Sequence, residues 1–81
     1  MKLELYTIDD IHAQAIKLFL NKNNLLFKEI NINEDNLYPE RKVSYLKITK
    51  NHSITIINGF NELMLNQLIE HIKKYNPKTE V

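Results

Sequence analysis

The sequence predicts a small α/β domain whose four-stranded sheet mixes parallel and antiparallel strands. Three observations point to this fold class. Near the N-terminus, apolar residues first alternate, as in a strand, and from Ile11 onward they fall three and four apart, as in a helix. A second strand follows that helix, and two strands joined through a helix are parallel neighbours. Two further strands separated by a short polar turn indicate an antiparallel hairpin, and a last helix follows them.

The first strand is expected over Lys2–Thr7, where leucines alternate with Glu and Tyr. Asp9 or Asp10 then caps a helix, because a carboxylate accepts hydrogen bonds from the free N–H groups of a first turn. The helix is expected to run to about Lys22, with Asn23-Asn24 ending it. The apolar stripe that we expect to face the core consists of Ile11, Ala15, Leu18 and Phe19.

The second strand is expected over Leu25–Asn33. Leu26, Ile30 and Ile32 fall on one face of it, and its nearly continuous apolar start is typical of a strand covered on both faces. The polar stretch of residues 34–42 contains Pro39, and it forms either a short helix or a loop.

Val43–Thr49 and Ser53–Ile57 are the expected hairpin strands, and the last helix is expected over Asn61–Tyr75 with Asn61 as its N-cap. The apolar face expected for this helix consists of Phe60, Leu63, Met64, Leu68, Ile72 and Tyr75. Residues 1–76 then make one domain and residues 77–81 a frayed tail. This order of elements is the thioredoxin-like arrangement, an α/β fold with helices on both faces of a four-stranded mixed sheet.

The composition excludes several classes of function. Eleven basic and ten acidic residues leave a net charge of +1, which is far from the basic excess of nucleic-acid-binding domains. No apolar run approaches the roughly 20 residues of a membrane-spanning helix, and the N-terminus lacks the basic and apolar regions of a signal peptide. We therefore expect a cytoplasmic protein that binds neither nucleic acid nor membranes.

The absence of cysteine from the chain has the largest chemical consequence. It removes disulfides, thiolate nucleophiles, iron–sulfur ligation and cysteine-based zinc sites. Asp9, Asp10 and His12 lie on one short turn, which gives poor geometry for a metal ion. We therefore expect no metal site, and a domain stabilised by packing alone.

Four stretches follow the pattern of one known family. Lys2–Thr7 ends in Tyr-Thr, Leu25–Asn33 contains Phe-x-Glu-Ile-Asn-Ile-Asn, Lys42–Ile48 contains Val-Ser-x-Leu-x-Ile, and Asn58–Leu63 reads Asn-Gly-Phe-Asn-Glu-Leu. In this order and at this spacing, they resemble the strands and the last helix of the glutaredoxin family, within the thioredoxin-like superfamily. The resemblance covers nearly the whole chain. The small glutaredoxin-like electron donors of ribonucleotide reductase are the most similar in length.

The chain departs from that family at its chemical positions. The resemblance puts the family's Cys-x-x-Cys on Asp10–Ala13, or on Ile11–Gln14 if no loop residue is deleted before it. The family's cis-proline falls on Ser44, and the first glycine of its Gly-Gly pair falls on Asn58. Because a non-proline cis peptide costs about 2.5–4 kcal/mol, we expect a trans peptide between Val43 and Ser44. The chain thus resembles a degenerate member.

Thiol–disulfide exchange needs a thiolate, so we expect no dithiol or monothiol oxidoreductase activity from this chain. The resemblance favours a redox-inactive glutaredoxin-like protein that binds a protein partner through the former active-site groove. One alternative is a glutathione-linked protein whose chemistry comes from a cosubstrate or from a partner's thiol. Another is a structural subunit that pairs through its exposed sheet edge.

The resemblance also implies which residues line the former glutathione groove. They are Asp10, Ile11, His12, Val43, Ser44, Asn58, Gly59, Asn61 and Glu62. Glutathione is expected to bind weakly or not at all, because the family's cysteine and its usual basic residue are missing. Asp9 and Asp10 also offer their own negative charge to the helix N-terminus. Capping is the simpler role for these aspartates, and exposure to solvent is the simpler state for His12. We expect no catalytic residue and no cofactor.

Overall fold

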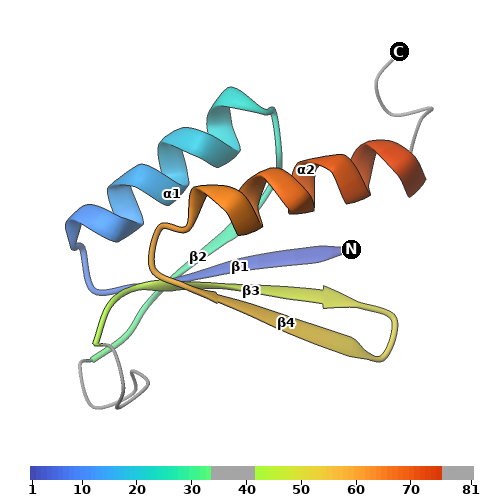
Figure 1. Ribbon diagram of the computed structural model, residues 1–81. Coiled ribbons are helices and arrows are strands. Elements are labelled where there is room, and N and C mark those ends of the chain that lie inside the picture. Colours follow the sequence, from blue (N-terminus) through green and yellow to red (C-terminus); the bar gives the residue numbers. More distant parts are fainter. Residues whose placement is uncertain (34–41, 76–81) are drawn as a thin grey trace.

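The computed structural model describes residues 1–33 and 42–75. Its elements are β1 (Lys2–Thr7), α1 (Ile11–Lys22), β2 (Lys28–Asn31), β3 (Tyr45–Lys50), β4 (Ser53–Asn58) and α2 (Glu62–Tyr75), shown in Figure 1. The expected order of strands and helices is therefore present. The expected short helix or loop of residues 34–42 lies almost wholly outside the described residues, as does the expected tail of residues 77–81.

The four strands form one mixed sheet in the order β2-β1-β3-β4. β1 pairs with β2 in parallel, and the pairs β1–β3 and β3–β4 are antiparallel, which confirms the predicted pairing. In register, Leu5 lies opposite Leu46, and Leu46 lies opposite Ile57. All three side chains are buried, so the apolar rows of neighbouring strands point to one face of the sheet.

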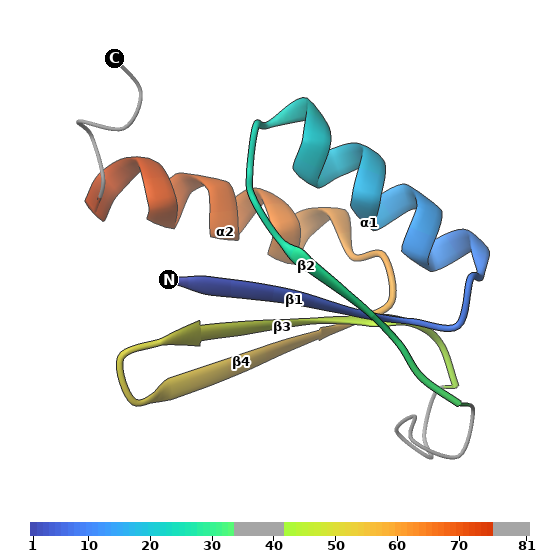
Figure 2. The ribbon, with the colours of Figure 1, turned by 180° about the vertical axis from the view of Figure 1, so that it is seen from behind.

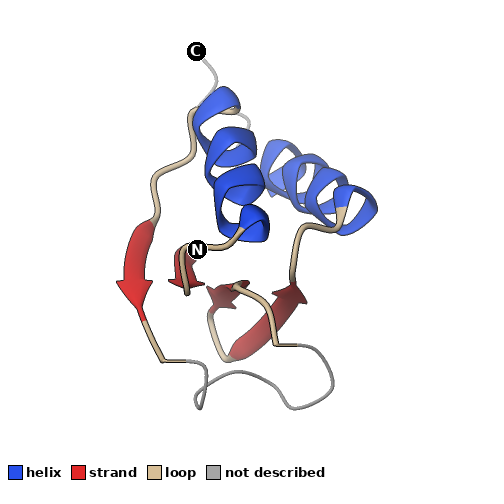
Figure 3. Ribbon diagram, turned by 90° about the vertical axis from the view of Figure 1, so that its left-hand side faces the viewer, coloured by secondary structure: helices blue, strands red, loops and turns tan. Residues whose placement is uncertain are grey.

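Both described helices cover that apolar face (Figure 3). Helices on both faces are therefore not seen among the described residues, and residues 34–41, for which either a short helix or a loop was expected, are not described. The opposite face carries polar and aromatic side chains and, on β4, Ile54 and Ile56. Tyr6 and Tyr45 stack there with ring centroids 4.9 Å apart, and Glu4 is buried between Lys28 and Lys47 in register.

The apolar stripe predicted for α1 is wrong in part: Phe19 packs against the core as expected, but Ile11 and Leu18 do not face it. Ala13, Ile16 and Leu20 are buried, whereas Ile11 and Leu18 are 76% and 71% exposed. Both sets have helical spacing, so the periodicity of apolar residues does not distinguish them. The choice depends on how the first turn of α1 is attached to the sheet, which the next section describes.

The strand prediction over Leu25–Asn33 is too long at its start. β2 begins at Lys28, and Leu26 before it is 94% exposed. β2 is not covered on both faces either, because three of its four residues are exposed. It is an edge strand that pairs only with β1 (Figure 2). An ion pair of 2.9 Å between Lys17 Nζ and Glu29 Oε2 joins it to α1.

The last helix has the predicted bounds to within one residue and the predicted cap, but one of its apolar positions differs. Leu63 is 69% exposed and Leu65 is fully buried. Leu68 is buried as expected, and Phe60, Met64 and Ile72 pack against the core. No helix within residues 1–33 and 42–75 has the length and apolar character needed to cross a bilayer.

Two substitutions on α1 test which stripe faces the core. We expect Ile16→Ala to lower the free energy of unfolding by about 2–5 kcal/mol, because it empties a fully buried position. Leu18→Ala, the matched control on the same helix, should change it by no more than about 0.5 kcal/mol. Urea denaturation followed by circular dichroism measures both. A larger loss for Leu18→Ala than for Ile16→Ala would restore the stripe that the sequence predicts.

Candidate functional site

The predicted site residues come together at one end of the sheet, on the left in Figure 1. The end of β1, the start of α1, the start of β3 and the start of α2 meet there. A hydrogen bond joins Asp10 to Ser44, and another joins Ser44 to Gly59. His12 contacts the backbone just before Asn61 and Glu62. The topology alone therefore assembles the positions that the resemblance selects.

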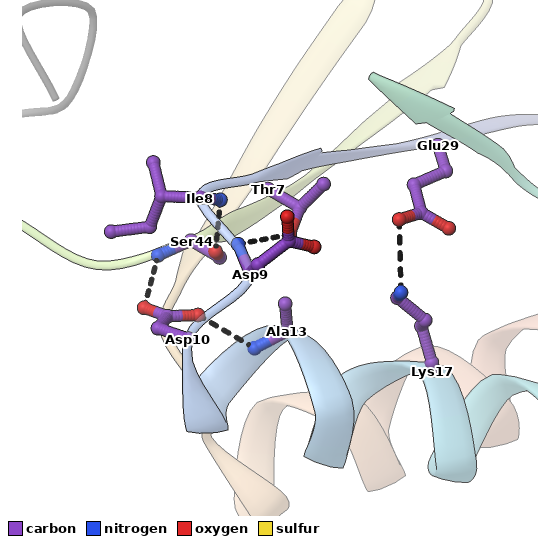
Figure 4. Close-up of polar contacts among 8 residues, drawn as sticks. All are labelled: Thr7, Ile8, Asp9, Asp10, Ala13, Lys17, Glu29 and Ser44. Carbon is purple, nitrogen blue, oxygen red and sulfur yellow. Dashed lines mark hydrogen bonds and ion pairs between the residues drawn. The ribbon is translucent and has the colours of Figure 1, made fainter. Parts of the chain in front are cut away.

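Asp10 is the N-cap of α1 and also reaches the sheet. Its Oδ1 accepts a hydrogen bond of 2.9 Å from the Ala13 N–H, and its Oδ2 accepts one of 3.0 Å from the Ser44 N–H (Figure 4). One carboxylate thus satisfies two backbone donors that are 31 residues apart in the sequence (44 − 13). This arrangement fixes the first turn of α1 against the start of β3.

Ser44 is fully buried and joins three segments. Its Oγ accepts from the Ile8 N–H at 2.9 Å, and its carbonyl oxygen accepts from the Gly59 N–H at 2.9 Å. Gly59 has a φ of 82°, in the left-handed region that glycine adopts at little cost. No cis peptide bond occurs in the described residues, so the predicted trans peptide between Val43 and Ser44 is confirmed.

The hydrogen bonds lower the pKa of Asp10 below its ordinary value of 3.8. Partial burial acts the other way and is the largest single influence. The backbone and hydroxyl hydrogen bonds from Ser44 and the hydrogen bond from the Ala13 N–H together outweigh it, and the nearby His12 makes the smallest contribution in the same direction. Asp10 is therefore an anion at neutral pH, and it occupies the N-terminus of α1 with its own negative charge.

Asp9 takes no part in capping, which resolves the choice between the two aspartates. Its backbone is in the left-handed region with a φ of 59°, and its N–H donates to Thr7 Oγ1 at 2.9 Å (Figure 4). Asp9 is exposed to solvent.

The expectation that His12 is exposed to solvent is wrong. The residue is half-buried, and its Nδ1 accepts a hydrogen bond of 2.9 Å from the Phe60 N–H. An accepting Nδ1 requires the neutral tautomer that carries its proton on Nε2. Sequence reasoning assigned Phe60 only to the core, and its N–H contact lies 48 residues from His12, a separation that no local pattern reveals.

The start of α2 is closed in a similar way. Asn61 Oδ1 accepts from the Met64 N–H at 3.1 Å, and the Asn61 carbonyl accepts from the Leu65 N–H at 2.9 Å, so the predicted N-cap is confirmed. Glu62 lies in the first turn and is exposed. Both helix N-termini at this end therefore have capping side chains of their own and a carboxylate nearby.

Two large apolar side chains lie on the surface at this end of the molecule. Ile11 follows the cap of α1 and Leu63 lies in the first turn of α2, and both are exposed. Val43, next to Ser44, is half-buried. We call Ile11, Val43 and Leu63 the apolar edge. Apolar side chains are thus exposed next to backbone donors that are already bonded within the chain.

Two groups often used in catalysis are absent from the chain or already engaged at this end. The chain has no thiol, and the His12 lone pair at Nδ1 is used by the backbone. Across residues 1–33 and 42–75, no three His, Asp or Glu side chains converge as a metal ion would require.

Comparison with models of protein families, with curated proteins and with solved structures finds no match for this chain.

The Asp10 hydrogen bonds predict a stability that depends on pH. Asp10→Asn should lower the free energy of unfolding at pH 7 by about 1 kcal/mol, because the amide keeps one acceptor for Ala13 but turns donors toward the Ser44 N–H. A lowered folded-state pKa means that the carboxylate's stabilisation is complete above its ordinary value of 3.8 and is lost as the pH falls through the lower value. The difference between the wild type and the variant should therefore shrink as the pH falls below 3.8.

Urea midpoints measured from pH 7 down to the acid limit would check this. Asp9→Asn is the matched control, since it removes a neighbouring charge that accepts no hydrogen bond from Ser44 or Ala13. Equal losses for the two variants at neutral pH, or a loss for Asp10→Asn that persists in acid, would contradict the assigned role of Asp10.

Proposed function

We propose that the chain is a cytoplasmic, glutaredoxin-like protein without thiol chemistry, which binds a protein partner through the apolar edge. The observation on which this depends is the exposure of Ile11 and Leu63 beside backbone N–H groups that are already bonded. Aliphatic side chains at such a surface favour contact with another apolar surface.

The element order supports the glutaredoxin-like part of the proposal. A parallel β1–β2 pair, an antiparallel hairpin and the strand order β2-β1-β3-β4 are compatible with a thioredoxin-like fold. Two of the positions where the sequence departs from the family, 10 and 44, are hydrogen-bonded to each other. A proline at position 44 would have no N–H to donate. The hydrogen bond to Asp10 therefore requires a residue other than proline at this position.

The charge and hydrogen bonding of the site argue against an anionic small molecule there. The Ser44, Gly59 and Phe60 N–H groups all donate to acceptors within the chain. A glutathione carboxylate would also meet the Asp10 anion, whose position at the helix N-terminus is the one most favourable for a bound anion. A neutral, apolar contact has neither of these costs.

Glutathione should therefore leave the site unchanged. In an amide chemical-shift titration with up to about 10 mM glutathione, at which even a ligand with a millimolar dissociation constant is mostly bound, we expect no saturable shifts at Val43, at residues 58–62 or in the first turn of α1. The matched comparison is Asp10→Ala, which frees the N–H groups of both Ala13 and Ser44. Saturable shifts in the wild type would favour the alternative in which glutathione supplies the missing thiol.

A charged side chain placed on the apolar edge should weaken the binding of the partner. We expect Ile11→Glu and Leu63→Glu each to weaken a specific complex isolated from the native cell by tenfold or more, about the 1.4 kcal/mol that one buried aliphatic contact contributes. Leu26→Glu is the matched control, since Leu26 is even more exposed and lies beyond the other end of α1. Affinity chromatography with the three variants in parallel measures this. A partner that all three retain equally would contradict the proposal.

A further inference from the structure

A hollow of about 470 Å³ lies under α2 at the hairpin end of the sheet, away from Asp10. Its size is within the roughly 300–1,000 Å³ of small-molecule sites. Ile48 and Ile57 line it from the sheet, and Met64 and Leu68 line it from α2. All four belong to the hydrophobic core or pack against it, so this side of the hollow is apolar.

The hollow exists because of the residues that β4 presents to α2. In strand alternation, the positions on the helix-covered face run from Ile57 to Thr55 to Ser53 toward the hairpin turn. Ile57 is buried, whereas Thr55 and Ser53 are exposed and line the hollow. Small hydroxyl side chains thus stand where a larger apolar residue would fill the space beneath α2.

The mouth of the hollow carries positive charge. Lys50 Nζ lies 2.7 Å from His71 Nε2, so an ammonium from β3 meets an imidazole from α2. This contact fixes the position of the Lys50 charge at the mouth. Among the described residues that line the hollow, none is Asp or Glu, and Glu70 next to His71 is exposed and does not line it.

We propose that this hollow binds a small organic carboxylate with an unbranched apolar body. The apolar body would lie on Ile48 and Leu68, and the carboxylate would lie at Lys50 and His71. An apolar cavity with a few convergent polar groups at one end is the usual form of such sites, and a carboxylate at an ammonium gains a charge-assisted hydrogen bond. This site is independent of the apolar edge, which lies at the other end of the sheet.

Sodium octanoate is the probe that tests the proposal, with 1-octanol as the uncharged ligand of equal chain length. In amide chemical-shift titrations of the full chain, octanoate should cause saturable shifts at Ile48, Ile57 and Leu68, with a dissociation constant of about 1 mM, as expected for about ten non-hydrogen atoms. Octanol should bind about three- to tenfold more weakly, because it lacks the charge.

Variants of exposed or half-buried positions separate the charge from the cavity. Lys50→Gln should weaken octanoate about three- to tenfold and leave octanol unchanged. Lys47→Gln, on the same strand but on the opposite face, should change neither. Thr55→Phe should abolish binding of both ligands by filling the hollow, and a strand position tolerates the aromatic ring.

Three results would overturn the proposal. One is the absence of saturable shifts around the hollow at about 10 mM octanoate, tenfold above the expected dissociation constant. Another is equal affinity for octanoate and octanol, or equal effects of Lys50→Gln and Lys47→Gln, which would remove the assigned role of the charge. The third is octanoate binding that survives Thr55→Phe, which would place the ligand elsewhere on the protein.

Discussion

The hydrogen bond between the Asp10 carboxylate and the Ser44 N–H determines how the rest of the domain is arranged. Ser44 is fully buried, and a buried backbone N–H without a partner would be costly. Because the same carboxylate caps α1 through Ala13, the bond sets both the position and the rotation of that helix. Ala13 then points inward at the first turn, and Ile16 and Leu20 follow on the same side at helical spacing.

The same bond engages polar groups at this end of the sheet that a ligand could otherwise contact. A helix N-terminus is normally a ready place for an anion, but here each helix is capped by a side chain of its own, Asp10 for α1 and Asn61 for α2. His12 engages one more backbone donor, because its Nδ1 accepts a hydrogen bond from the Phe60 N–H. Ile11 and Leu63 are exposed at this end without a polar group of their own to satisfy, which is why the proposed function depends on them.

Local signals in the sequence were sufficient for the order of the strands, their pairing and the cap of α2, and they narrowed the cap of α1 to Asp9 or Asp10. These signals involve residues only a few positions apart. They are the alternation in Lys2–Thr7, the short turn before Ser53, and the cap residues Asp10 and Asn61. The sequence misled where two answers had equal local support. Ile11-Leu18 and Ala13-Ile16-Leu20 are both helical stripes, and Leu63 and Leu65 are both apolar residues at the start of α2. Contacts across 34 and 48 residues decided the first turn of α1 and the state of His12, and no periodic pattern contains them.

The two ends of the β3–β4 hairpin differ because their residues differ, although the strand pairing is continuous. At one end Leu46 faces Ile57, and both are buried under the helices. At the other end Lys50 faces Ser53, one half-buried and one exposed. The apolar core therefore ends before the sheet does, while α2 continues above it with Leu68 and His71. A helix that extends past its apolar support leaves space between the two layers. In this chain the residues at the mouth of that space are basic, which makes an organic anion a better occupant than water alone.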